Sequence, residues 1–173
     1  MRGRRPALAA VACAVAVAVS GCTQHPSLAT ASESQASLDR MIVVADAAMT
    51  ASGFGSWSYG SGVAFSGGAQ ESFADTADCS ATQLGAPVQT VGQRPTLTLH
   101  VAGNSGLSAD AGRRVESRIG AAWRKLGLEV APERPGRGQI PLVGSDKQVD
   151  AVWTSATATL TLSGLCAKQA PAG

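Results

Sequence analysis

The sequence predicts an α+β fold in which helices cover one face of a single sheet. Three observations predict this class. Two segments repeat their apolar residues with the period of a helix, and a third alternates apolar and polar residues as a half-buried strand does. The end of the chain alternates in the same way. We therefore expect a two-layer sandwich, with one mainly antiparallel sheet of about four strands, an N-terminal amphipathic helix and one disulfide.

The first helix is predicted to begin at Ser37 and to end at Gly53. Its apolar residues recur at i, i+3, i+4, i+7 and i+11, which places them on one helical face. They are Leu38, Met41, Ile42, Ala45 and Met49. Glycine is common just after the last helical residue, because it adopts a left-handed backbone without strain.

A segment rich in Gly and Ser, residues 53–68, follows the helix and is predicted to form a loop. Aromatic residues make up only 4% of the chain, yet four of them lie here. They are Phe54, Trp57, Tyr59 and Phe65. These side chains either form a ligand surface or pin the loop onto the core, and we favour the second interpretation.

Residues 94–101 form the clearest predicted strand, because apolar and polar residues alternate strictly. One face carries Leu97, Leu99 and Val101, and the other carries Thr96, Thr98 and His100. The apolar face should pack against the helices.

A second helix is predicted from Ser108 to Leu126. Ser108 is a favourable N-cap, Asp110 lies at the positive end of the helix dipole, and Gly127 ends the helix. Its apolar stripe comprises Ala111, Val115, Ile119, Ala122, Trp123 and Leu126. Its exposed side carries Arg113, Arg114, Arg118, Arg124 and Lys125. This basic face is either a contact for anionic headgroups or an acidic wall polymer, or simply a solvated surface, which we favour.

Further strands are predicted at 128–133, 140–144 and 149–166. The last of these is either one long strand or two with a break near Ser155. The strand–helix–strand portion could be parallel through a right-handed crossover, whereas the final strands are close enough in sequence to pair as antiparallel hairpins.

The start of the chain predicts an export signal. Arg2, Arg4 and Arg5 precede an apolar run at residues 7–19, and small residues then precede Cys22. This order is typical of a secretory signal peptide. The run is short for a membrane-spanning helix, which needs about 20 residues.

The residues Val19–Cys22 resemble the lipobox of bacterial lipoproteins. Together with Cys79, Ala121–Trp123 and Ser163–Cys166, they make the chain similar to small lipoproteins of actinobacterial cell envelopes. This resemblance implies that the Cys22 thiol receives a diacylglyceryl group and that a peptidase cuts before it. In some such proteins the new amino terminus also carries a fatty acid such as palmitate. The alternative is an ordinary secretory signal with a chance cysteine, and Cys13 is removed in either case.

The residues and the resemblance together predict a division of the chain. Residues 1–21 are the signal peptide, 22–36 a flexible tether, 37–166 a single α+β domain and 167–173 a frayed tail. The resemblance places the domain at the extracytoplasmic face of the cell membrane, held there by the lipid on Cys22.

Two cysteines, Cys79 and Cys166, lie in the predicted domain. An even pair in an exported chain indicates a disulfide rather than a metal or redox site. The alternative is a pair of free buried thiols.

The charge balance argues against nucleic acid as a partner. Three of the 14 basic residues lie in the leader, which leaves 11 against 12 acidic residues. Without the leader the chain therefore has no overall positive field.

The sequence contains none of the common catalytic, nucleotide-binding or metal-binding motifs. We therefore predict no cofactor, no metal and no enzymatic activity, and expect a binding or envelope-associated module whose partner is an envelope protein, a lipid or a wall component. The alternative is a lipid-anchored hydrolase with a site assembled around His100 and an Asp and a Ser from elsewhere.

Overall fold

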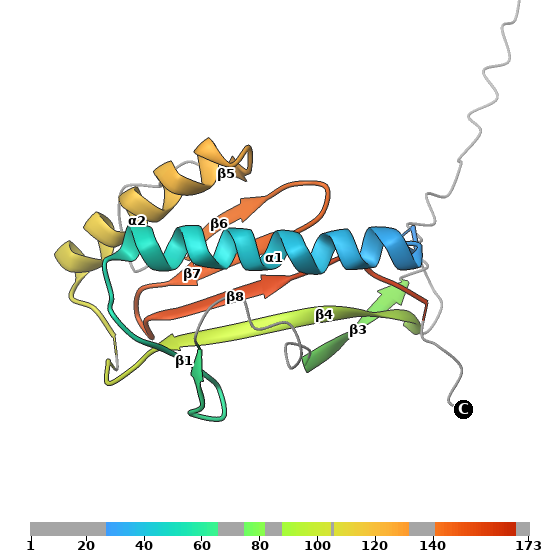
Figure 1. Cartoon of the computed structure of the whole chain (residues 1–173), viewed down its shortest axis with the longest axis horizontal. Helices are drawn as coiled ribbons and strands as arrows, with labels where there is room; N and C mark the ends of the chain where they lie inside the picture. Colours follow the sequence, from blue (N-terminus) through green and yellow to red (C-terminus); the bar gives the residue numbers. More distant parts are fainter. Residues whose placement is uncertain (1–26, 66–74, 82–87, 105, 132–140, 169–173) are drawn as a thin grey trace, which may run out of the picture.

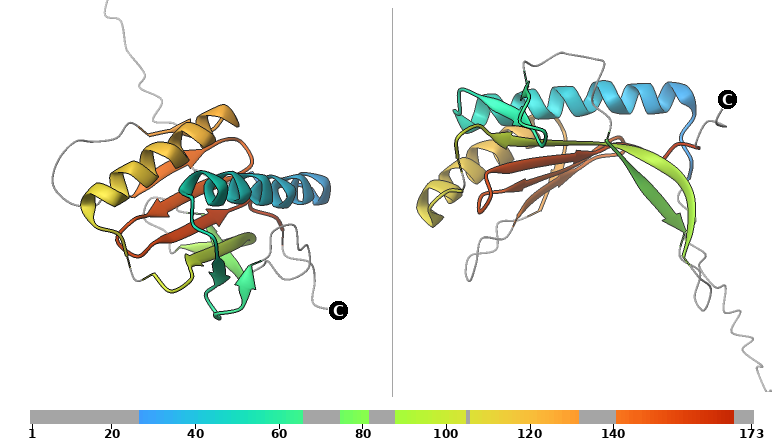
Figure 2. Two further views of the ribbon diagram at one scale, coloured as in Figure 1. Left: turned by 60° about the vertical axis from the view of Figure 1, so that its left-hand side comes forward. Right: turned by 90° about the horizontal axis from the view of Figure 1, so that it is seen from below.

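The computed structural model describes residues 27–65, 75–81, 88–104, 106–131 and 141–168. In this part of the chain two helices lie on one face of a single sheet (Figures 1 and 2), so the predicted α+β class is confirmed. The helices are α1 (Ala31–Ser52) and α2 (Ala109–Lys125). The strands are β1 (Trp57–Tyr59), β2 (Ala64–Phe65), β3 (Asp75–Ala81), β4 (Gln89–Val101), β5 (Glu129–Val130), β6 (Leu142–Ser145), β7 (Asp150–Thr154) and β8 (Thr159–Ser163).

The strands lie in the order β2-β1-β4-β8-β7-β6-β5, and β3 pairs with β4 beside β1. Each pair of neighbouring strands is antiparallel. Because four antiparallel steps separate β4 from β5, these two strands run in the same direction, and α2 connects them across the helical face. The predicted parallel crossover is therefore present, with β6, β7 and β8 inserted between its two strands.

The prediction of about four strands is wrong, because the described sheet has eight. Part of the Gly- and Ser-rich segment, predicted as a loop, forms the β1–β2 hairpin. Strand β3 was not predicted, because its alternating apolar residues are only Ala77, Cys79 and Ala81, and it pairs with β4 alone, away from the main core. The final alternating segment is two antiparallel strands, β7 and β8, joined by a turn that begins at Ser155.

Helix α1 begins at Ala31, six residues before the predicted start at Ser37, so residues 31–36 are its first turns rather than part of a tether. Thr30 and Glu33 form a capping box: the Thr30 side chain accepts from the Glu33 N–H, and Glu33 accepts from the Thr30 N–H. The Thr30 N–H and the Thr30 hydroxyl both donate to the Glu33 carboxylate, and these two hydrogen bonds lower the pKa of Glu33.

The core lies between the two helices and the sheet. Helix α1 contributes Met41, Val44, Ala45 and Ala48, helix α2 contributes Val115, Ile119 and Trp123, and the sheet contributes Leu97, Leu99, Val101, Ala151, Trp153, Leu160 and Leu162. The predicted inward faces of β4 and β8 are thus confirmed. Trp123 lies over Gly144 of β6, where an added Cβ would come within 2.7 Å of the Trp123 ring.

Ser37 joins three segments near the beginning of α1. Its fully buried hydroxyl donates to the Gln148 carbonyl at 2.7 Å and accepts from the Leu165 N–H at 2.9 Å. Gly164 is so close that an added Cβ would lie 2.6 Å from the Ser37 Oγ and 2.7 Å from Pro95 Cγ. One hydroxyl therefore ties α1 to the β6–β7 turn and to the segment after β8.

A second polar contact holds α1 to the same turn. Arg40 Nε donates to Asp146 Oδ2 at 3.0 Å, and Arg40 Nη2 donates to the Leu126 carbonyl at 2.6 Å. Partial burial acts to raise the pKa of Asp146. The N–H groups of Gln148 and Val149 and the Arg40 guanidinium outweigh that effect, so the pKa is lowered.

The segment after β8 is held by a disulfide and by backbone hydrogen bonds. Cys79 and Cys166 are bonded, with a Cα–Cα distance of 6.1 Å, which confirms the predicted pair. Ala167 exchanges two backbone hydrogen bonds with Gln93, and the Ala29 N–H donates to the Cys166 carbonyl. The first residue of the predicted tail is therefore paired with the sheet.

Candidate functional site

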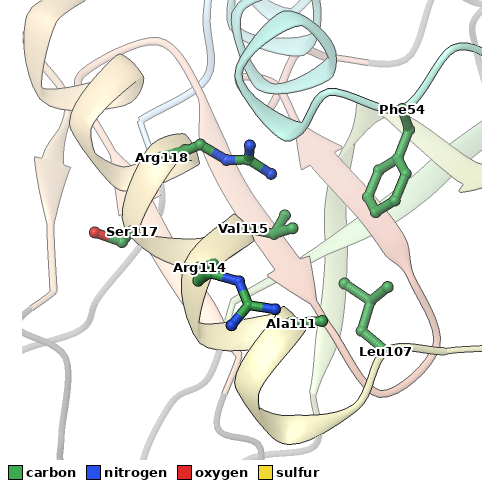
Figure 3. A pocket seen from close by; sticks show the side chains of 7 residues that line it. All are labelled: Phe54, Leu107, Ala111, Arg114, Val115, Ser117 and Arg118. Carbon is green, nitrogen blue, oxygen red and sulfur yellow. The ribbon is translucent and has the colours of Figure 1, made fainter.

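A groove of about 530 Å³ lies beside the first half of α2, near the carboxyl end of α1 (Figure 3). It is lined by Phe54, Leu107, Ala111, Arg114, Val115, Ser117 and Arg118. Figure 3 shows α2 forming one wall and Phe54 and Leu107 lying opposite, with Val115 and Ala111 between them. Its volume falls in the range of small-molecule sites, roughly 300–1,000 Å³.

The end of α1 positions Phe54. Gly53 has a left-handed backbone with φ of 78°, which ends the helix and turns the chain toward the sheet. The Phe54 ring then stacks on Trp153 at a centroid distance of 6.4 Å and meets Trp57 edge-on at 6.3 Å. Because Trp57 and Trp153 are both buried, this wall of the groove is fixed by the core.

The start of α2 positions the other apolar residues. The Ser108 side chain accepts from the Ala111 N–H, which confirms Ser108 as the N-cap. Just before it, the Leu107 N–H donates to the Ser155 carbonyl at 3.0 Å. Val115 is 4% exposed and belongs to the core, so it forms the floor where the groove meets the interior.

Two arginines one helical turn apart give the groove its charge. The Arg118 Nη2 group donates to the carbonyl of Ser52, the last residue of α1, at 2.7 Å. This contact supplies a positive charge at the negative end of the α1 dipole, where α1 itself has no basic residue. Arg114 is exposed and has no hydrogen-bond or ion-pair partner among the described residues.

The nearest acidic residues of α2 are engaged elsewhere. Glu116 accepts from the Ser155 hydroxyl at 2.6 Å, and that hydroxyl in turn accepts from the Trp153 Nε1 at 2.8 Å. Asp110 is paired with Arg113. None of the described residues that line the groove is acidic, so its local charge is positive.

Among the described residues, no hydrolase site is assembled around His100. His100 lies on β4 between buried Leu99 and Val101, and therefore on the sheet face opposite the helices. Its Nδ1 is within 3.2 Å of the Thr159 hydroxyl, and no carboxylate contacts it among the described residues. An orienting carboxylate is what a catalytic histidine of the triad type requires, so this geometry gives the alternative function no support.

The predicted aromatic and basic groups are divided between core and groove. Trp57 and Phe65 are buried and Tyr59 contacts Phe65 edge-on, so the loop is pinned to the core as predicted. Phe54 serves both purposes, because it packs on this core and lines the groove. The basic face of α2 is exposed as predicted, but two of its arginines, Arg114 and Arg118, line the groove.

Two cysteines near the start of the chain, Cys13 and the predicted lipidation site Cys22, lie outside the part of the chain that the structure describes. Within the described part of the chain, neither helix has the length and apolarity needed to cross a bilayer, and no group of His, Cys, Asp and Glu side chains could hold a metal ion.

Comparison with known proteins finds no matching family model, no matching curated protein and no matching solved structure.

Proposed function

We propose that this chain is an exported lipoprotein, anchored to the outer face of the cell membrane through Cys22. Its α+β domain is a non-catalytic binding module that contacts a partner in the cell envelope. The observation that supports export most directly is the Cys79–Cys166 disulfide. Disulfides persist in oxidising extracytoplasmic compartments and are rare in the cytosol.

The leader sequence also supports export and lipidation. Its basic start, apolar run and Val19–Cys22 sequence match the order of a lipoprotein signal. One acyl chain alone binds a membrane only marginally, whereas two or three chains on one residue hold a protein there stably.

Metabolic labelling with an alkyne fatty acid tests the anchor. We expect the native product to be labelled and membrane-bound, and Cys22→Ser to abolish the label and release the protein. Cys13→Ser is the matched control, because it makes the same substitution within the segment that the peptidase removes. Labelling should therefore persist. Protease treatment of intact cells should digest the anchored domain if it lies outside the membrane. Retention of the label by Cys22→Ser would show that another group is acylated and that the proposed anchor is wrong.

A further inference from the structure

We propose that the groove beside α2 binds an anionic amphiphile with a single acyl chain. The apolar chain lies between Phe54 and Val115, and a phosphate or carboxylate head lies against Arg114 and Arg118. The inference rests on the proposed binding function and names the ligand class of that site.

The charge of the groove indicates an anionic head. Arg114 and Arg118 lie four positions apart on one helix, a spacing that brings their Cβ atoms to about 5–6 Å and at which like charges repel each other. No acidic side chain in the described part of the chain lines the groove, and the carboxylates of Asp110 and Glu116 are bonded elsewhere. An anion between the two guanidinium groups would relieve this repulsion and accept charge-assisted hydrogen bonds.

The opposite wall indicates an apolar tail. Phe54 and Leu107 face α2 across the groove, and their positions are fixed by Trp153 and by the backbone bond to Ser155. Ala111 is small and half-buried, so it leaves open the space beside Val115 that a larger side chain would fill. The groove therefore combines a charged wall with an apolar one, which matches a molecule with one charged end and one apolar body.

An extended peptide is a less suitable occupant. The lining residues come from α2 and from the loops at Phe54 and Leu107, and no strand of the described sheet contributes to it. A peptide added as a strand would need the free backbone groups of a sheet edge. An acyl chain needs only apolar contact and a charged partner for its head.

The binding test uses the full chain carrying Cys22→Ser, so that no acyl group of its own competes, after mass measurement has verified the Cys79–Cys166 bond. Isothermal titration calorimetry compares decyl phosphate and decanoate, each below its micelle concentration. Decyltrimethylammonium tests the same tail with the opposite charge, and inorganic phosphate tests the head alone. We expect both anions to bind and the cation not to bind, with octyl phosphate about tenfold weaker than decyl phosphate.

Three variants test the position of the ligand. Arg114→Gln should weaken decyl phosphate about tenfold, because a charge-assisted hydrogen bond is lost. Ala111→Phe should abolish binding by filling the groove, while the circular-dichroism melting temperature stays near that of the parent. Arg124→Gln removes the same charge from an exposed position of α2 outside the groove and should change the affinity by less than twofold.

The outcomes separate the two proposals. A preference for decyl phosphate would indicate a phospholipid-like source, and a preference for decanoate would indicate a free fatty acid. Equal binding of decyltrimethylammonium, or an unchanged affinity in Arg114→Gln, would overturn the inference, as would tight binding of an acidic peptide with none of decyl phosphate. If the titrations showed no binding, the groove proposal would be wrong but the fatty-acid label on Cys22 would still support the anchor. If the label were absent, the anchor proposal would be wrong but the titrations would still test the groove.

Discussion

Replacing Ser37 by alanine should destabilise the domain far more than the loss of one surface hydroxyl would. The Ser37 side chain is the hydrogen-bond partner of the Gln148 carbonyl and of the Leu165 N–H, and it is fully buried. A buried donor or acceptor left without a partner costs about 1–3 kcal/mol. With two such groups, and some relaxation around them, we expect Ser37→Ala to lower the free energy of unfolding by about 2–4 kcal/mol.

Urea unfolding followed by circular dichroism measures this loss. With a typical slope of about 2 kcal/mol per molar urea, the midpoint should fall by about 1–2 M without a change in slope. Ser34→Ala is the matched control, because Ser34 lies one helical turn earlier in α1, is only half-buried and has no side-chain hydrogen bond among the described residues. A loss in Ser37→Ala no larger than that of the control would refute the argument.

Gly164 allows a second test of the same contact. Gly164→Ala alone should be destabilising, because its Cβ would lie 2.6 Å from the Ser37 Oγ and 2.7 Å from Pro95 Cγ. When Ser37 is alanine, one of these two clashes is gone. The double variant should therefore be more stable than the sum of the single losses predicts, by roughly 0.5–3 kcal/mol. Simple additivity would mean that Ser37 and Gly164 are not in contact.

Three further predictions follow from single contacts. Replacing Cys79 and Cys166 together by serine should lower the free energy of unfolding by about 4 kcal/mol, because the bond closes 87 residues of sequence separation; a loss below about 1 kcal/mol in urea unfolding would contradict this. Asp146→Asn should lower stability by about 1.5–3 kcal/mol at pH 7. The pKa of Asp146 is lowered in the folded state, so the stability difference between Asp146→Asn and the parent should be lost as the pH falls below about 4 and through the folded pKa. A stability difference that persisted in acid would show that the ionised carboxylate is not its cause. Gly144→Ala should cost about 1–3 kcal/mol by placing a methyl group against a buried tryptophan ring. Gly55→Ala, in open space, should have a much smaller effect on the melting temperature.

The elements that the sequence predicted well are those that bury one face. Helix α2 begins and ends where its cap and its final glycine indicated, and the alternating residues of β4 and β8 point as expected. Burial fixes the residue type at every second or every third to fourth position in such elements, so their period is visible in the sequence. The same reasoning predicted that the aromatic residues of 53–68 pack on the core.

The elements that were not predicted are stabilised by interactions that produce no apolar period in the sequence. Strand β3 pairs with β4 through its backbone, and β1 and β2 are too short for a period to show. The earlier start of α1 depends on the Thr30–Glu33 capping box, a local signal present in the sequence but outside its apolar pattern. The groove could not be predicted, because Phe54 and Leu107 meet α2 only once the tertiary fold is formed. The only feature of the groove that the sequence showed was the four-residue spacing of Arg114 and Arg118.

The proposed anchor and the proposed groove lie at opposite ends of α1. Its 22 residues span about 33 Å at 1.5 Å per residue. The Ala29 N–H is bonded to the Cys166 carbonyl at the beginning of the helix, whereas Arg118 contacts Ser52 at its end. Ala31 follows Cys22 by nine positions, and this stretch can extend over at most about 30 Å. A domain standing upright on such a link would hold its groove well clear of the bilayer, and one lying with α1 along the surface would bring Arg114 to the headgroups. The ligand class proposed for the groove therefore favours a domain that lies along the membrane when it takes up or releases an acyl chain.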